Sequence, residues 1–303
     1  MLSSVPFREE SVSGTDYLAL VTRLLHRVRL ADPAAGLWEA ADFQWWWRRD
    51  RASDDYGQLL WIDSQGEPVA GVIFTSGGRG EPCQCDVIVA PDHADQMFGG
   101  VWRRALSRMA ELSIDTVEVA VRDDDTAMLD AIAAAGFTAT GDTGTSSWLN
   151  SGDRPGVAPL PDGFGLLSRA QTADRPHHMI ARNGADVAAR LAQCSLYEPE
   201  LDLLVLAPDG DVAAYGLFWA DPVTGVGLVE PMRTEQQYWR NGLARHVLTM
   251  GLDRLAAHGC TRLKVSSGHP LYLGVGFTPM APDQTYLARA RPDGARHAQV
   301  IGK

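Results

Sequence analysis

The sequence predicts an α/β fold with a mixed sheet, built from two copies of one unit. Three observations predict it. Apolar runs and amphipathic segments follow one another in the order strand, strand, strand, helix, strand, helix, and this order occurs twice. A segment rich in Gly and Pro separates the two occurrences at 150–165. The chain of 303 residues is long enough for two domains of roughly 150 residues, each with its own core.

The first copy begins with two apolar runs around a polar turn, "LLWIDSQGEPVAGVIF" at 59–74, which is typical of a β-hairpin. A strand at 87–93 then ends at a proline, and an amphipathic helix is expected at 101–112. A strand at 116–121 and a short helical segment at 129–137, ending in Gly-Phe, complete the unit.

The second copy repeats these elements at 203–218, 227–234, 243–259, 262–267 and 271–277. The turn glycines, the strand-ending prolines and the closing glycines of the two copies lie 140 to 144 residues apart. Four segments in one order at a nearly constant offset indicate an internal repeat rather than chance. We therefore expect one domain at residues 1–150 and a second at residues 151–303.

The composition excludes several classes of function. The net charge is −11, so long-range electrostatics oppose binding to nucleic acid or to an anionic membrane. No apolar run approaches the roughly 18 residues of a membrane helix, and the N-terminal segment lacks the basic and apolar stretches of a signal peptide. We expect a cytoplasmic protein, monomeric or homodimeric, that acts on a small molecule. An anionic ligand would need a locally arranged set of donors.

The cysteines and the paired histidines predict neither a disulfide framework nor a metal site. Four cysteines are too few and too scattered, and Cys83 and Cys85 face the same way if they lie on a strand. His177 and His178 are adjacent, and we interpret them as part of a solvated loop. We expect no metal.

Three segments of the second copy carry a resemblance to a known family: "VEPMRT" at 229–234, "WRNGLA" at 239–244 and "YLGVGF" at 272–277. With the order of elements, they resemble the GCN5-related N-acetyltransferase (GNAT) superfamily, present twice. More narrowly, the chain is similar to the tandem acetyltransferases, a group that includes mycothiol synthase. The resemblance implies two GNAT (acyl-CoA N-acyltransferase) domains and acetyl-CoA as cosubstrate.

The resemblance also implies a binding site for the cofactor's diphosphate at the start of the helix expected from residue 243. The family loop reads Gln/Arg-x-x-Gly-x-Gly/Ala, and this chain departs from it at Trp239. A helix N-terminus offers unpaired N–H donors and a positive dipole end, and glycine lets an oxyanion approach the backbone. Alternatively, Gly242 only shapes a turn and Arg240 is solvated. The cofactor-binding residues implied are Arg240, Asn241, Gly242, Leu243 and Ala244.

For catalysis, the resemblance implies a backbone N–H near Met232 or Arg233 that polarises the thioester carbonyl. It implies Tyr272 as the acid for the leaving thiolate, because a phenol is protonated at neutral pH. Glu230 is the expected base that deprotonates the amine. The alternatives are a core aromatic for Tyr272, and a cation-binding or ion-paired carboxylate for Glu230. His269 is a weaker candidate for the base.

The first copy lacks the cofactor loop and the catalytic residues expected in the second copy. Ile132 stands at the position of Tyr272, and "QMFGGV" at 96–101 matches the cofactor loop only in part. We expect a degenerate domain that acts as a scaffold, with a second, weak CoA site as the alternative. The expected function is acetyl-CoA-dependent N-acetyl transfer to a primary amine of a small molecule, with the active site in the C-terminal half.

Two departures leave another function open. Besides Trp239, the final helix of the second copy is short, and Pro270 is expected to open it. The alternative function is therefore a catalytically weak or inactive acyl-CoA-binding sensor.

The segment "FQWWWRRD" at 43–50 bears on the acceptor. Three consecutive residues on a helix point about 100° apart, so Trp45, Trp46 and Trp47 cannot all face one core. They either pack against the second half or form a possible wall for the acceptor amine through cation–π attraction. We favour packing, and we place the acceptor cleft between the halves.

Overall fold

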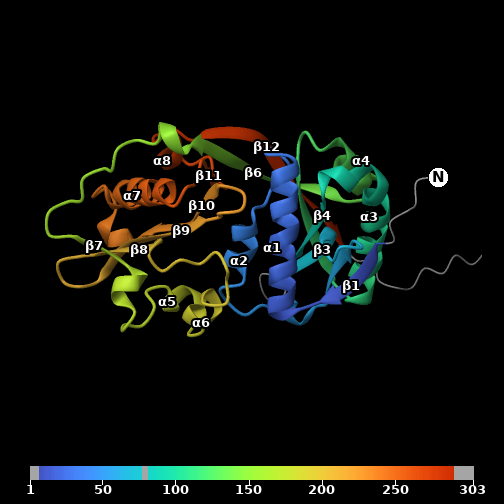
Figure 1. Cartoon of the computed structure of the whole chain (residues 1–303), viewed down its shortest axis with the longest axis horizontal. Coiled ribbons are helices and arrows are strands. Elements are labelled where there is room, and N and C mark those ends of the chain that lie inside the picture. The colour runs from blue at the N-terminus through green and yellow to red at the C-terminus, as the bar shows by residue number, and fades with distance from the viewer. Residues whose placement is uncertain (1–6, 77–80, 290–303) are drawn as a thin grey trace, which may run out of the picture.

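The computed structural model describes residues 7–76 and 81–289. Twelve strands form one mixed sheet that runs through the whole molecule (Figure 1). In their order across the sheet, the strands are β1 (Arg8–Val12), β2 (Gln58–Ile62), β3 (Pro68–Ser76), β4 (Cys83–Val89), β5 (Thr116–Arg122), β12 (Thr278–Arg289), β6 (Thr138–Asn150), β11 (Arg262–Val265), β10 (Val226–Thr234), β9 (Val212–Ala220), β8 (Asp202–Leu206) and β7 (Gly165–Ser168).

Helices pack on both faces of this sheet. The α-helices of the described residues are α1 (Gly14–Ala31), α2 (Ala40–Trp46), α3 (Ala94–Glu111), α4 (Thr126–Ala134), α5 (Ile180–Asn183), α6 (Val187–Leu191), α7 (Leu243–Ala257) and α8 (Pro270–Leu273). Short 3-10 turns follow β4 (η2, Pro91–His93) and β10 (η5, Gln236–Tyr238). In the part of the chain that the structure describes, no helix has both the length and the apolar character needed to cross a bilayer.

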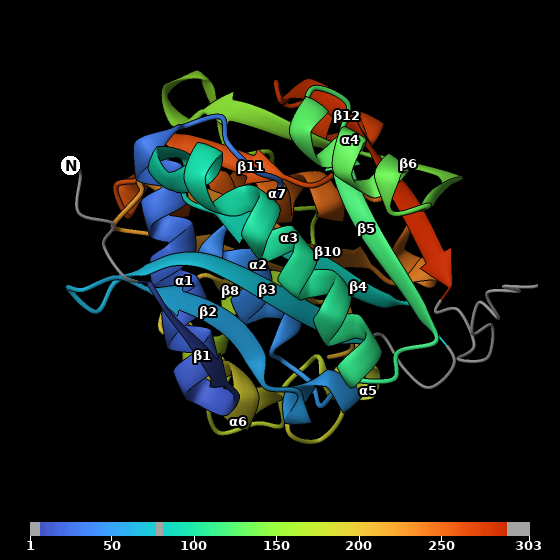
Figure 2. The same cartoon turned by 90° about the vertical axis from the view of Figure 1, so that its right-hand side faces the viewer.

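The repeat predicted from the sequence is confirmed. The two expected hairpins are β2–β3 and β8–β9, and each is followed by a strand, a long helix, a parallel strand and a short helix. The α/β fold with a mixed sheet is therefore correct. Figure 2 shows the first copy in front, with α3 lying across the strands β2 to β5.

Alternating side chains on the strands separate the cores. In β2, Leu60 and Ile62 face α1 and α2, whereas Leu59 faces α3 and α4. In β9, Leu217 joins the same core as Leu60, whereas Phe218 packs with α7 on the other face. One core is thus shared by α1 and α2 of the first half, α6 of the second half, and strands of both halves.

The two halves also exchange their last strands, which the sequence did not predict. The final strand of the first half, β6, pairs with β11 of the second half. The final strand of the second half, β12, pairs with β5 of the first half and with β6. Figure 1 shows β6 and β12 bridging the halves along the top of the molecule. The expected domain boundary at residue 150 coincides with the end of β6, and it stays a prediction.

Candidate active site

Strand β10 bends where the sequence places the catalytic residues. Val229 pairs with Phe218, but the next pair along the ladder is Met232 with Gly216, so β10 contains one extra residue. Against β11, β10 pairs only from Val226 to Leu228. Beyond Leu228 the two parallel strands separate, and Glu230 lies at the point of separation.

The strand geometry distinguishes the two candidate backbone amides. The N–H of Glu235 donates to the carbonyl of Ala213 on β9 at 2.9 Å. Because backbone N–H groups alternate in direction along a strand, the N–H of Arg233 also points toward β9. The N–H of Met232 then points the other way, into the gap beside β11. Of the two predicted amides, the geometry favours Met232 as the one that polarises a carbonyl.

Glu230 has the properties of a base that works near neutral pH. Burial, and next the charge of Asp42, raise its pKa to about 7. The charge of Arg48 and a hydrogen bond from the Trp45 indole act in the opposite direction. The indole of Trp219 donates to the backbone carbonyl of Glu230 at 2.8 Å and holds this part of β10 in place.

Tyr272 lies close enough to Glu230 to feel its charge. Burial, and then the Glu230 carboxylate, raise the pKa of Tyr272 to about 12, so its phenol keeps its proton at neutral pH. Pro270 is the first residue of α8, as predicted. His269 caps this helix, because its Nδ1 accepts from the N–H of Leu271 at 3.1 Å. That bond occupies the lone pair that His269 would need to act as a base through Nδ1.

The N-terminus of α7 is an open set of backbone donors. Gly242 is its N-cap with φ +76°, in the left-handed region that glycine tolerates best. An added Cβ at Gly242 would meet no atom within 4 Å. The structure records no acceptor for the N–H groups from Asn241 to Ala244 within the described residues. These residues fit the diphosphate of an acyl-CoA, because N–H groups and the helix dipole both attract an anion.

Two side chains flank this loop. Arg240 is exposed and has φ +64°, which is uncommon for a residue other than glycine. Trp239, the residue that departs from the family pattern, is 60% exposed, and its indole donates to the carbonyl of Thr234 at 2.9 Å. It lies back along the end of β10, so it leaves the N-terminus of α7 open.

The corresponding region of the first half is built differently. Helix α3 begins at Ala94, directly after η2, so "QMFGGV" at 96–101 lies inside the helix. Its N–H groups therefore belong mostly to the helix ladder. Ile132 is 1% exposed and fills the core under α4. These features support a scaffold in the first half.

Strands β4 and β5 also separate, beyond a two-residue ladder, and leave a cavity of about 600 Å³. Its only cationic side chain, Arg122, is paired with Asp124. A diphosphate would face an excess of negative charge there. The carboxylates lining this cavity are Asp32, Asp86, Asp95, Asp124 and Asp125.

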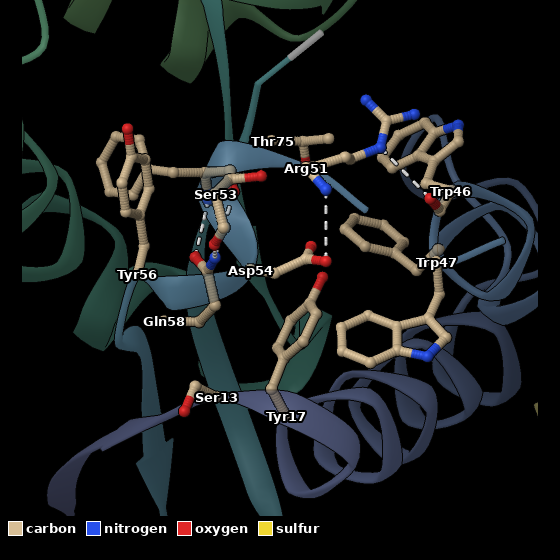
Figure 3. Close-up of a pocket in the computed structure, with 12 residues that line it drawn as sticks. Ser13, Tyr17, Trp46, Trp47, Arg51, Ser53, Asp54, Tyr56, Gln58 and Thr75 are labelled. Atoms are coloured by element: carbon tan, nitrogen blue, oxygen red, sulfur yellow. Dashed lines mark hydrogen bonds between the residues drawn. The ribbon is translucent and has the colours of Figure 1, made fainter. Parts of the chain in front are cut away.

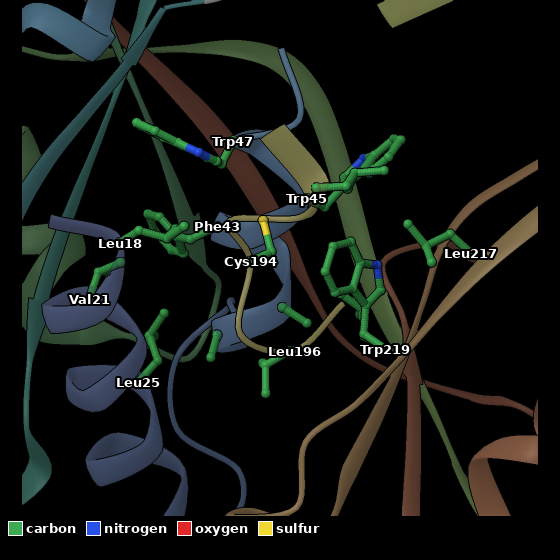
Figure 4. Packing of buried hydrophobic residues seen from close by; sticks show 14 of the residues in the cluster. Leu18, Val21, Leu25, Phe43, Trp45, Trp47, Cys194, Leu196, Leu217 and Trp219 are labelled. Carbon is green, nitrogen blue, oxygen red and sulfur yellow. The ribbon is translucent and has the colours of Figure 1, made fainter. Parts of the chain in front are cut away.

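Two of the three consecutive tryptophans, Trp45 and Trp47, pack against the second half, so the packing that we favoured from the sequence holds for these two. Trp45 lies in the shared core near Trp219 and Cys194 (Figure 4). The indole of Trp47 donates to Gln193 of the second half at 2.8 Å. Trp46 points instead into the first half, where it lines a pocket of about 20 Å³ with Trp47 (Figure 3). That volume holds about one water molecule, so this pocket is too small for an acceptor; Trp46 also lines a cavity of about 340 Å³ beside Glu81 and Glu118.

A buried ionic cluster also joins the halves. Lys264 of β11 is 1% exposed, and its ammonium lies 3.2 Å from Glu39 and 3.8 Å from Asp42, at the two ends of the first turn of α2. Arg29 of α1 completes the cluster through Glu39. Burial raises the pKa of Asp42 to about 6, with Lys264 acting against this shift. Since Asp42 in turn raises the pKa of Glu230, this cluster sets the charge next to the proposed base.

The interpretation of His177 and His178 as a solvated loop is wrong. Both imidazoles are buried, and their Nε2 atoms lie 3.1 and 3.2 Å from the two carboxylate oxygens of Asp202. Tyr197 donates to the same carboxylate at 2.8 Å. Nδ1 of His177 accepts from the N–H of Met179 at 3.2 Å. We therefore interpret the cluster as a buried network of polar and ionic contacts around Asp202.

Comparisons with known proteins agree with this fold. Residues 167–277 match the model of the acetyltransferase (GNAT) family. The fold is similar to a tandem GNAT protein from the clavulanic acid biosynthesis pathway, with a TM-score of 0.67, 15% identity, and coverage of 95% of this chain and 100% of that one. A GCN5-related N-acetyltransferase from Sphaerobacter thermophilus gives a TM-score of 0.60 and 16% identity, with coverage of 95% and 98%.

A third structure of similar fold is an N-myristoyltransferase from Saccharomyces cerevisiae with bound myristoyl-CoA and inhibitors. Its TM-score is 0.54 at 14% identity, with coverage of 96% of this chain and 81% of that one. Curated protein sequences give no match, so the likeness to mycothiol synthase stays a prediction. The family match supports an acyltransferase activity. Residues 167–277 therefore match the GNAT acetyltransferase family, and the fold of the whole chain is that of a tandem GNAT protein.

Proposed function

We propose that this protein transfers an acetyl group from acetyl-CoA to a primary amine of a small molecule, and that the active site lies in the second half. The observation that carries the proposal is that Glu230, at the point where β10 separates from β11, lies close enough to Tyr272 for its charge to raise the pKa of the phenol. Glu230 has a pKa of about 7, and Tyr272 has a pKa of about 12. A group that can accept a proton thus lies near a group that keeps its own.

Each residue has a chemical task in this proposal. Acetyl-CoA, when bound, supplies the acetyl group and a thiolate leaving group. The backbone N–H groups from Asn241 to Ala244 hold its diphosphate, with Arg240 able to add a charge-assisted bond. The carboxylate of Glu230 takes a proton from the ammonium form of the acceptor, which frees the lone pair for attack.

The leaving side of the reaction uses Met232, on the same strand as Glu230, and Tyr272 of α8. The N–H of Met232 donates to the carbonyl oxygen of the acetyl group, where negative charge develops. The phenol of Tyr272 donates a hydrogen bond to the sulfur as the C–S bond breaks. Because its pKa of about 12 lies above that of a thiol, Tyr272 stabilises the thiolate mainly by this hydrogen bond.

Substitution of the two side chains tests the assignment. With acetyl-CoA and a panel of primary amines, Glu230→Gln should lower kcat/KM by about 10²- to 10⁴-fold, and Tyr272→Phe should also lower it. Release of free CoA is the readout, and calorimetry should show unchanged acetyl-CoA binding. Glu111→Gln and Tyr286→Phe are matched controls on α3 and β12, away from the gap. Wild-type rates in both active-site variants would refute these roles.

The same assay separates the enzyme from a sensor. A sensor is the second candidate because Trp239 and the short α8 depart from the family pattern. If the protein is a sensor, the wild type should bind acetyl-CoA and release no CoA with any amine.

A further inference from the structure

Arg48 lies at the junction of the two halves, beside the carboxylate proposed as the base. It follows the C-terminal end of α2, which packs against β10. Its guanidinium carbon lies 3.7 Å above the centroid of the Trp45 ring. Trp45 and the charge of Arg48 both lower the pKa of Glu230. Arg48 and Glu230 therefore both lie near Trp45.

The hydrogen-bond partners of Arg48 are all neutral. Its Nε donates to the amide oxygen of Asn183 on α5 at 2.6 Å, and its Nη1 donates to the carbonyl of Trp45 at 2.9 Å. Within residues 7–76 and 81–289, no carboxylate lies within 4.0 Å of this guanidinium. The carboxylate of Glu230 acts on Arg48 only through its charge. A largely buried cation with no carboxylate in direct contact is costly to a folded protein, which points to a partner supplied from outside.

A second arginine at the same junction also stacks on a tryptophan, but it has carboxylate partners. Arg190 of α6 stacks on Trp47 at 4.0 Å, in the same way that Arg48 stacks on Trp45. Arg190, however, forms ion pairs with both Asp50 and Asp54. The stacking alone therefore does not replace a carboxylate at this junction.

Further positive charge surrounds the same place. Arg182 of α5 and Arg233 of β10 both lie near Tyr215, as Arg48 does. Glu235 pairs with Arg182 at 3.0 Å and with Arg233 at 3.1 Å. One carboxylate thus serves two arginines, and Arg48 has no carboxylate within 4.0 Å and only the charge of Glu230 near it, although the whole chain has a net charge of −11.

These arginines lie on the other face of the sheet from the N-terminus of α7. Trp45 and Tyr215 belong to the core shared by the halves, whereas α7 packs against Phe218 and Val229 on the opposite face. Hence the arginines are not part of the site proposed for the cofactor's diphosphate. They face the side on which an acceptor would approach Glu230.

We propose that the acceptor amine carries an oxyanion, a carboxylate or a phosphate, and that Arg48 binds this group. This inference rests on the proposed function, because it assigns an acceptor to the same site. Arg48 would bind with its remaining N–H donors, and Arg182 and Arg233 would attract the same charge. A guanidinium held by Asn183 and Trp45 is already oriented, so little side-chain entropy is lost on binding.

Matched probes test the inference directly. Glycine and glycinamide differ in the carboxylate, and phosphoethanolamine and ethanolamine differ in the phosphate. Calorimetry at constant ionic strength, with and without acetyl-CoA, measures the binding of each. In at least one pair the anionic probe should bind about tenfold more tightly or better, as expected for a hydrogen bond between charged groups. The pair that shows the preference tells which oxyanion the site takes.

Variants then test whether Arg48 is the source of the preference for anionic probes. Arg48→Gln should abolish it and leave the affinity for acetyl-CoA unchanged, whereas Arg104→Gln, an exposed arginine on α3, should change neither. Asn183→Asp keeps Arg48 but gives it an internal carboxylate, so it should also abolish the preference. This second variant covers the case in which Arg48→Gln does not fold.

The inference is overturned if no probe binds, if neutral and anionic probes bind equally, or if both variants keep the preference. Failure of the proposed function has a different signature. In that case the anion preference persists, but acetyl-CoA does not bind or no acetyl group is transferred.

Discussion

At the scale of single residues, the proposed role of Glu230 as the base makes its charge decide when the site should work. Opposing effects hold the pKa of Glu230 near 7. Burial and Asp42 raise this pKa, whereas Arg48 and Trp45 lower it. Below pH 7 the carboxyl group is protonated and cannot accept the proton of the amine. Activity that depends on Glu230 should therefore rise as the pH increases through about 7.

Asp42→Asn tests this electrostatic coupling. The substitution removes the negative charge that raises the pKa of Glu230, so the rising limb of kcat/KM should move to lower pH. The asparagine keeps an oxygen that can accept the bond from the N–H of Glu39, now 2.7 Å long. A pH–rate profile of the wild type and the variant measures the shift. If the rising limb of kcat/KM stays at the same pH in Asp42→Asn, a group other than Glu230 controls it.

Gly242 is the residue that shapes the proposed cofactor cradle. Alanine at φ +76° is strained, and Gly242→Ala should lower the free energy of unfolding by about 1 kcal/mol. It should also weaken acetyl-CoA binding, because the methyl group projects into the open space above the backbone.

Gly99→Ala is the matched control for Gly242→Ala. Gly99 lies inside α3 with nothing within 4 Å of an added Cβ. There alanine should stabilise the helix by up to about 1 kcal/mol, with no effect on acetyl-CoA binding. Urea denaturation and calorimetry measure both effects, and equal losses of stability in the two variants would contradict the strain at Gly242.

At the scale of elements, the network of His177, His178 and Tyr197 around Asp202 fixes the segment before α5 to β8. Burial raises the pKa of Asp202, but the two neighbouring histidines outweigh this effect and lower the pKa to about 2. Because this pKa is depressed, the stabilisation is present above the unfolded value of about 3.9. It should be lost as the pH falls from about 4 to about 2.

Asp202→Asn should lower the free energy of unfolding by about 3 kcal/mol, since breaking a buried charged network leaves its partners unpaired. Asp130→Asn, at an exposed position on α4, should change it by less than about 0.5 kcal/mol. Urea unfolding at pH 7 measures both. A change of similar size in the two variants would contradict the structural role of the network.

The elements also show what the sequence can predict. The hairpins, α3, α7 and the parallel strands follow from apolar runs of clear period, and each half displays them independently. Strand β6 has the sequence "TATGDTGTSSWLN", and most of its side chains are exposed, so no apolar alternation marks it. Its partners, β11 and β12, lie far along the chain.

The sequence likewise predicts some residues of the candidate site and not others. Glu230, Gly242 and Tyr272 stand out because they lie in short segments that resemble a family pattern. Arg48, Asp42 and the buried histidines do not, because their partners come from the other half or from a distant strand. A buried charge is identified only when the residue opposite it is known.

At the scale of the whole molecule, the two halves depend on each other for both sheet and core. Strand β12 lies between β5 and β6, and β6 lies between β12 and β11. The shared core takes Leu60 and Trp45 from the first half and Leu217 and Trp219 from the second. Since the groups around Glu230 come from both halves, we expect the site to exist only in the assembled chain.

Dividing the chain between Asn150 and Ser151 tests this dependence. Residues 1–150 alone lack β12 and β11, so β5 and β6 lose their partners and become exposed edges. Each piece also exposes its side of the shared core. We expect either piece alone to aggregate or to stay unfolded, and the two pieces produced together to form a 1:1 complex that binds acetyl-CoA. Size-exclusion chromatography and calorimetry measure both properties.

A cut made after folding is the control for the divided chain. A protease site placed between Gly156 and Val157, both exposed in the segment after β6, allows the intact protein to be cleaved in its native state. The pieces should stay together and unfold in one transition, because the exchanged strands and the shared core still hold them. If residues 1–150 alone were instead a monomer with its own cooperative unfolding transition, the halves would be independent domains, and the strand exchange would contribute little to the stability of either.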